Sequence, residues 1–227
     1  MTNCLSMESI SSDEVIKNVA SKVKAFHEGD TTGHDWWHIW RVWNLARRIG
    51  EREDANMLQV ELAALLHDMD DHKMAHSDGE NLPNARKVLL DCNVEHTLLD
   101  GVLTIIKQVS FKGAGVDTTP TSLEACVVQD ADRLDAIGAI GIARAFAYGG
   151  SKHRELYNPN EEPSMHSTFS EYKNSKGNTL NHFYEKLLLL KDRLNTPAAQ
   201  ELAISRHSYM LGFVEQFLGE WNLDDKP

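Results

Sequence analysis

The segment ALLHDMDD at residues 64–71 joins an apolar helical run to a cluster of ionisable side chains. Four of its last five residues are ionisable, and burying such groups costs free energy unless they have partners. On a helix, His67 and Asp71 share one face, whereas His67 and Asp68 lie about 100° apart and can converge on one ion. Imidazole and carboxylate together suit a divalent metal ion. The alternative is a helix end that turns polar as it leaves the core.

Hydrophobic residues on both sides of this segment recur at helical spacing, and no strand pattern or internal repeat is present. Asp35 is a fitting N-cap for a helix to about residue 51, and another helix runs from about residue 54 into the segment. Further helices are expected at about residues 13–26 (capped by Ser12 or Asp13), 80–92, 95–109, 121–135 (opened by a capping box at 121–124), 179–194, and from the Thr196 N-cap onward. The sequence therefore predicts an all-α fold, a single compact domain over residues 13–222 after a flexible segment at 1–12.

Composition and charge exclude several classes of partner. The chain has 227 residues and a formal net charge of −11, so it repels nucleic acid polymers and acidic membrane surfaces. A small phosphorylated substrate is not excluded, because a bound cation and a few basic residues reverse the charge locally. The three cysteines show no metal-binding spacing, and there is neither a signal peptide nor a long apolar run. We expect a cytoplasmic protein outside the membrane; the oligomeric state stays open, and a dimer is compatible.

Two other ionisable side chains lie on otherwise apolar helical faces. The helical face that carries His38 continues through Val42 and Ile49, and Asp132 follows the apolar run at residues 125–128. A lone inward histidine is more often bonded to a backbone carbonyl, so His38 alone does not define a metal site. Separate buried polar sites would each cost stability, whereas one shared ion would satisfy them together. We therefore infer a common metal site formed by three helices.

This ligand set leaves room for chemistry at the ion. Two imidazoles and two carboxylates leave one or two positions of a five- or six-coordinate ion open for water and substrate. Mn²⁺ is the ion that we expect, and Co²⁺, Fe²⁺, Ni²⁺ and Mg²⁺ also fit chemically. The glycine-bearing sequence SFKGAG at 110–115 is either a loop that presents Lys112 to an anion or a plain surface loop. Residues 149–165 lack periodicity and are either a lid or a surface connection.

The order His38, His67-Asp68, Asp132 resembles the H…HD…D signature of the HD-domain superfamily of metal-dependent phosphohydrolases. The neighbouring sequences HDWWHIWRV at 34–42, ALLHDMDDHK at 64–73 and DADRLDAIGAIGIAR at 130–144 are similar to those of a compact bacterial and fungal subgroup. One type in this subgroup is a nucleotide pyrophosphohydrolase. The resemblance extends over about residues 15–222 and implies an HD-domain fold.

The resemblance also implies a role for individual residues. The four signature residues would bind one divalent ion, and Asp71 would orient or deprotonate a water molecule. Charge on the substrate phosphates would be met by Lys73, Lys112 and Arg133. HD enzymes with two metals need further histidines between the HD pair and the last Asp, and this interval has only His72, His76 and His96. A single ion is therefore expected.

The resulting hypothesis is a phosphohydrolase that converts (deoxy)nucleoside triphosphates to monophosphate and pyrophosphate. Two separate lysines suit a multiphosphate tail and favour this reaction. The alternatives are a nucleoside monophosphate phosphatase, a non-catalytic module that binds a metal and a nucleotide, and a two-iron HD oxygenase.

Overall fold

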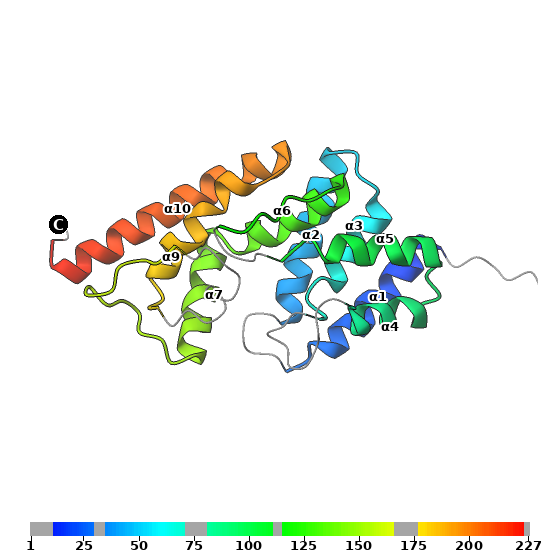
Figure 1. The fold of residues 1–227 in the computed structure, drawn as a ribbon, viewed down its shortest axis with the longest axis horizontal. Coiled ribbons are helices and arrows are strands. Elements are labelled where there is room, and N and C mark those ends of the chain that lie inside the picture. The colour runs from blue at the N-terminus through cyan, green and yellow to red at the C-terminus, as the bar shows by residue number, and fades with distance from the viewer. Residues whose placement is uncertain (1–10, 30–34, 71–80, 111–114, 166–176, 225–227) are drawn as a thin grey trace, which may run out of the picture.

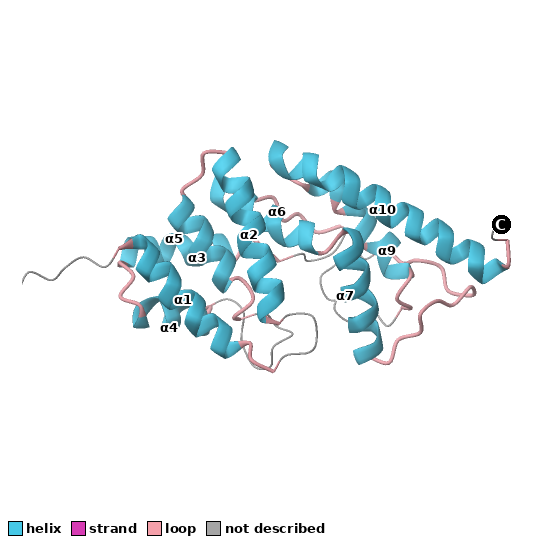
Figure 2. Ribbon diagram, turned by 180° about the vertical axis from the view of Figure 1, so that it is seen from behind, coloured by secondary structure: helices cyan, strands magenta, loops and turns pink. Residues whose placement is uncertain are grey.

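The computed structural model describes residues 11–29, 35–70, 81–110, 115–165 and 177–224. Within these ranges the secondary structure is α-helix with two short 3₁₀ helices, and no strand is present, which confirms the predicted all-α class (Figure 2). The elements are α1 Ser12–Phe26, α2 Trp36–Arg52, α3 Met57–Leu66, α4 Pro83–Asp91, α5 His96–Ile106, α6 Leu123–Asp135, α7 Gly138–Ser151, α9 Asn181–Glu185, η1 Leu187–Leu189, η2 Lys191–Arg193 and α10 Pro197–Asn222. Among the described helices, none combines the length and the apolar composition that crossing a membrane requires.

Helix α6 lies between two groups of helices. Figure 1 shows α1 to α5 on one side of it and α7, α9 and α10 on the other. Helix α2 packs against both α6 and α3, α3 packs against α5, and α10 packs against α7. Apolar side chains from both groups join one buried core. The central position of α6 places its inward side chains where both groups can reach them.

Side-chain caps fix where the key helices begin. The Asp35 carboxylate accepts a hydrogen bond from the backbone N–H of His38 at 3.0 Å, so α2 begins where the sequence predicts. Thr196 caps α10, and Pro197 occupies its first turn, again as predicted. The cap at Asp35 places His38 in the first turn of α2, and the fully buried His38 shows that this turn faces inward.

Three predicted boundaries were wrong. Helix α3 ends at Leu66, so His67 is its C-cap residue and the helix does not continue through the HD pair. Ser11 caps α1. Ser122 caps α6 by accepting from the backbone N–H of Ala125, and the Glu124 carboxylate accepts from Asn56 in place of completing a capping box. At the starts of α1 and α6, adjacent polar residues offered alternative caps, and the cap lies one residue from a predicted position.

The helix predicted over residues 179–194 is also interrupted. Its first part is α9, which ends at Glu185, and Lys186 departs from helical geometry with φ −142°. Two 3₁₀ turns follow, and they still bury Leu187, Leu190 and Leu194. Of the apolar residues expected to face the core in this helix, Leu180, Phe183 and Leu187 are buried, whereas Tyr184 is exposed.

A glycine allows the sharp turn between α6 and α7. Gly138 adopts φ +77°, a left-handed conformation that costs other residues about 1–2 kcal/mol. A Cβ added there would lie 3.1 Å from the side chain of Arg206. This turn sets the direction in which α7 leaves α6, against which α7 still packs.

The substitution Gly138→Ala should therefore lower the free energy of unfolding by about 1–2 kcal/mol. At this chain length that corresponds to a decrease in Tm of about 2–4 °C per kcal/mol, measured by thermal unfolding. Gly150→Ala is the matched control, because Gly150 lies inside α7 with no atom near its added Cβ, and alanine favours the helix. Equal stability of Gly138→Ala and the wild-type protein would contradict this role of the turn.

Candidate metal centre

The structure brings the four signature side chains together. His38 lies in the first turn of α2, His67 and Asp68 directly follow α3, and Asp132 lies on α6. The two imidazole Nε2 atoms are 3.3 Å apart. Asp68 oxygens lie 3.2 Å from Nε2 of His38 and 3.5 Å from Nε2 of His67. For Asp132 Oδ1 the corresponding distances are 3.6 Å and 3.9 Å.

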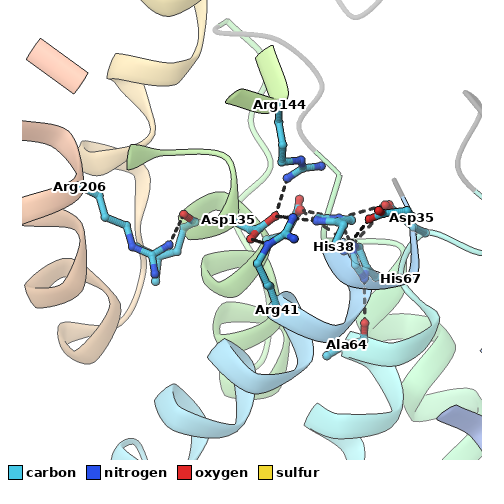
Figure 3. A network of polar contacts seen from close by, with 11 residues as sticks. Asp35, His38, Arg41, Ala64, His67, Asp135, Arg144 and Arg206 are labelled. Carbon is cyan, nitrogen blue, oxygen red and sulfur yellow. Dashed lines mark hydrogen bonds and ion pairs between the residues drawn. The ribbon is translucent and has the colours of Figure 1, made fainter. Parts of the chain in front are cut away.

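Each imidazole is oriented through its other nitrogen. Nδ1 of His67 lies 2.8 Å from the backbone carbonyl oxygen of Ala64, and Nδ1 of His38 lies 2.8 Å from Oδ2 of Asp135 (Figure 3). Both partners are acceptors, so each neutral ring carries its proton on Nδ1. The Nε2 lone pairs of both rings then point toward the shared centre.

This arrangement fits a cation. Two nitrogen lone pairs and two carboxylates converge, and all four groups are acceptors when the histidines are neutral. Ligand atoms of His38, His67 and Asp132 lie within 4.8 Å of one another, close enough to bind one ion. A divalent cation relieves their mutual repulsion and satisfies the lone pairs together, which the donor set of two imidazoles and two carboxylates favours.

Burial is uneven around the cluster. His38 is fully buried, and His67 and Asp68 are nearly so. The side chain of Asp132 is 29% exposed. Solvent therefore reaches Asp132, whereas the other three signature residues are shielded from it.

Asp135 is a functional residue whose role the sequence analysis missed. It is 2% exposed, and besides His38 it accepts hydrogen bonds from Arg41 at 2.6 Å and 3.1 Å and from Arg144 at 2.7 Å. Asp135 follows Asp132 by three residues, and Arg41 follows His38 by three residues, so each shares a helical face with a predicted ligand. This three-residue spacing is the feature of the sequence from which a role for Asp135 and Arg41 at the centre could have been predicted.

The charges around Asp135 determine how it ionises. Burial raises the pKa of its carboxyl group, but the hydrogen bonds from His38 and Arg41 and the charge of Arg144 outweigh burial, and the pKa lies well below its ordinary value. For His38, burial and Arg144 lower the pKa, whereas the hydrogen bonds to Asp135 and Asp68 raise it. The net result is a pKa above the ordinary value of 6.5.

The other acidic and basic residues near the signature in sequence are not seen at the centre in the part of the chain that the structure describes. Asp70, which shares the ionisable cluster of residues 67–71, caps α4 by accepting from the backbone N–H groups of Asn84 at 3.0 Å and Ala85 at 2.9 Å. The predicted catalytic residue Asp71 and the predicted phosphate-binding residues Lys73 and Lys112 lie outside the described residues.

The prediction that Arg133 binds substrate phosphate requires correction. Arg133 is 5% exposed, and its guanidinium donates to the backbone carbonyl of Arg193 and, at 3.0 Å, to the hydroxyl of Thr118. It therefore ties α6 to the segment before α10. Arg133 is adjacent to Asp132 in sequence, but one residue of an α-helix rotates the side chain by about 100°.

Comparison with known proteins identifies the family. The chain matches the HD domain over residues 36–137, a range that contains all four signature residues. It is 40% identical to YpgQ of Bacillus subtilis (strain 168) over 201 residues, which cover 88% of this chain and 90% of YpgQ. The chain belongs to the HD-domain superfamily of metal-dependent phosphohydrolases. The predicted superfamily and enzyme class are thereby confirmed.

Solved structures of similar proteins share this fold over nearly their full length. A protein from Lactobacillus plantarum is 38% identical, with a TM-score of 0.83, and the match covers 95% of this chain and 100% of that one. An HD-superfamily hydrolase from Bacillus thuringiensis is 42% identical, with a TM-score of 0.71 and coverage of 93% and 99%. YpgQ in complex with ADP is 35% identical in its aligned structure, with a TM-score of 0.71 and coverage of 93% and 96%.

Removal of one ligand should weaken metal binding by this HD domain. Asp132→Asn leaves a neutral amide where a carboxylate meets the ion, and we expect at least about a tenfold to hundredfold loss of Mn²⁺ affinity. Isothermal titration calorimetry on the metal-free protein measures the loss. Glu124→Gln, at the start of the same helix, is the matched control and should bind as the wild type does. Equal affinity of Asp132→Asn and the wild type would exclude Asp132 as a ligand.

The raised pKa of His38 gives metal binding a pH dependence of defined sign. A proton and a metal ion compete for Nε2, so affinity is highest above the pKa of His38 and falls as the pH decreases through it. We expect up to about a tenfold loss of Mn²⁺ affinity per pH unit below that pKa. Calorimetric titrations from about pH 6 to about pH 8 test this expectation. An affinity that is constant or that rises on acidification would argue against ligation by His38.

Proposed function

We propose that this HD domain is a nucleotide pyrophosphohydrolase, which hydrolyses (deoxy)nucleoside triphosphates to monophosphate and pyrophosphate with one divalent ion, Mn²⁺. The observation that carries the proposal is the convergence of two Nε2 lone pairs and two carboxylates at a centre that is open to solvent beside Asp132. Such a centre can bind an ion and still admit water and a phosphate ester.

Two further observations support a nucleotide as the substrate. YpgQ of Bacillus subtilis, 40% identical to this chain, has been solved in complex with ADP. The net charge of −11 disfavours nucleic acid polymers, whereas a small anion can bind where local positive charge exists. The proposal assigns this charge to the ion and to Lys73 and Lys112, because Arg41 and Arg144 are hydrogen-bonded to Asp135.

In the proposed reaction, some residues bind the ion and others orient its histidine ligands. His38, His67, Asp68 and Asp132 hold the ion, and Asp135 and the Ala64 carbonyl keep the protons of both imidazoles on Nδ1. A divalent ion bound there supplies a Lewis acid that lowers the pKa of water and polarises a phosphoryl oxygen. The proposal gives Asp71 the role of orienting or deprotonating the attacking water.

The proposal also assigns the substrate phosphates to basic residues near the signature in sequence. Lys73 follows Asp71 by two residues, and Lys112 lies in the glycine-bearing sequence FKGAG. Positive charge from these two lysines would offset the negative charge that develops on the phosphates in the transition state. Two lysines in separate segments suit a substrate that carries several phosphates.

Product analysis tests the reaction directly. The purified chain is incubated with Mn²⁺ and a panel of nucleoside tri-, di- and monophosphates, and the products are separated by anion-exchange chromatography. We expect monophosphate and pyrophosphate in equal amounts from triphosphates. Release of inorganic phosphate from monophosphates alone would identify a phosphatase, and no turnover of any phosphorylated compound would contradict an enzyme acting on nucleotides.

Histidine variants connect turnover to the proposed centre. His67→Ala should lower kcat by about a hundredfold or more, because a ligand is lost. His96→Ala is the matched control, since His96 is exposed at the start of α5 and should leave turnover unchanged. Loss of turnover in both variants would indicate that a second, histidine-dependent site takes part.

A further inference from the structure

Asp135 occupies a position that polar side chains rarely hold without a function. It is the last residue of α6, it is almost completely buried, and its carboxylate lies 2.8 Å from Nδ1 of His38, which is 97 residues earlier in the chain. Oδ1 accepts from Nε of Arg41, and Oδ2 accepts from a terminal nitrogen of Arg41 and from Arg144. Both carboxylate oxygens are therefore engaged by donors on other helices.

These contacts determine which nitrogen of His38 is available to a metal ion. A neutral imidazole carries one proton, on either Nδ1 or Nε2. A carboxylate facing Nδ1 accepts that proton's hydrogen bond and leaves the lone pair on Nε2.

Two arginines from different helices hold the Asp135 carboxylate in place through hydrogen bonds. Arg41 comes from α2, the helix that carries His38, and Arg144 comes from α7 across the turn at Gly138 (Figure 3). Their charges favour the ionised carboxylate despite its burial. The two guanidiniums also occupy fixed directions around it, which restricts rotation of the carboxylate about its side-chain bonds.

We propose that Asp135 is a positioning residue of the metal centre, which holds the His38 ring with Nε2 unprotonated and directed at the ion and is itself held by Arg41 and Arg144. The proposal rests on the metal centre proposed above and not on the identity of the substrate. Outer hydrogen-bond partners of ligating histidines typically change metal affinity by about 10- to 100-fold.

The first test compares two buried acids of α6. In Asp135→Asn, we expect the single carbonyl oxygen to accept hydrogen bonds from the arginines. The amide NH₂ group then faces Nδ1 of His38, to which it can only donate. We expect Mn²⁺ affinity, measured calorimetrically on the full chain, to fall by about 10- to 100-fold. Asp130→Asn is the matched control, because Asp130 is buried on the same helix but accepts hydrogen bonds from Asn195 and Thr196. This control should bind Mn²⁺ as the wild type does.

The second test observes the tautomer of the His38 ring. A purely structural role of Asp135 would leave this tautomer unchanged. Long-range ¹H–¹⁵N NMR spectra of the metal-free protein, at a pH where the ring is neutral, show which nitrogen carries the proton. We expect Nδ1–H in the wild type and a shift toward Nε2–H in Asp135→Asn. The wild-type spectrum is informative even if the variant does not fold, and a wild-type ring protonated on Nε2 would overturn the proposal.

The outcomes separate the positioning role from the metal centre. If the wild-type chain binds no Mn²⁺, both the metal centre and the role of Asp135 are refuted. If the wild type binds Mn²⁺ and Asp135→Asn binds it equally well, the positioning role alone fails. Reduced affinity in Asp135→Asn with unchanged affinity in Asp130→Asn, together with the changed tautomer, supports the proposal.

Discussion

The packing of α2 against α6 is the constraint on which the site depends. It brings His38, in the first turn of one helix, into contact with Asp132 and Asp135 near the end of the other. The cap at Asp35 fixes the start of α2, and therefore the direction in which His38 points. The HD pair is then added from the end of α3, which packs against α2.

The same packing creates a local electrostatic problem that a cation resolves. Lone pairs and carboxylates that converge at a buried place repel one another, and few donors are available there to satisfy them. An ion supplies the missing positive charge, so metal binding and folding of this region are coupled. Reciprocally, the Ala64 carbonyl and Asp135 hold the two rings in the form that binds metal.

Among the described residues of α7, α9 and α10, Arg144 is the side chain that hydrogen-bonds Asp135. Arg144 reaches Asp135 from α7, and this contact depends on the left-handed turn at Gly138. Helix α10 reaches the rest of the chain through hydrogen bonds, among them those of Arg206 to the Leu134 carbonyl and of the Ala198 N–H to Glu53. Helices α7 and α10 pack on each other through aromatic contacts of Phe146 with Phe213 and Phe217. In a chain with a net charge of −11, two arginines thus surround Asp135 on the Nδ1 side of the His38 ring.

The sequence by itself determined the fold class, the caps at Asp35 and Thr196, and the four signature residues, because ionisable groups on apolar helical faces and local cap chemistry are properties of neighbouring residues. Only the tertiary structure decided which polar neighbours serve the centre. Arg133, next to Asp132 in sequence, is turned toward Thr118 and Arg193, whereas Arg144 returns to Asp135 across a turn. The physical reason is that spacing along a helix shows which residues share a face, as Asp132 and Asp135 do, whereas the crossing of distant helices decides what that face contacts.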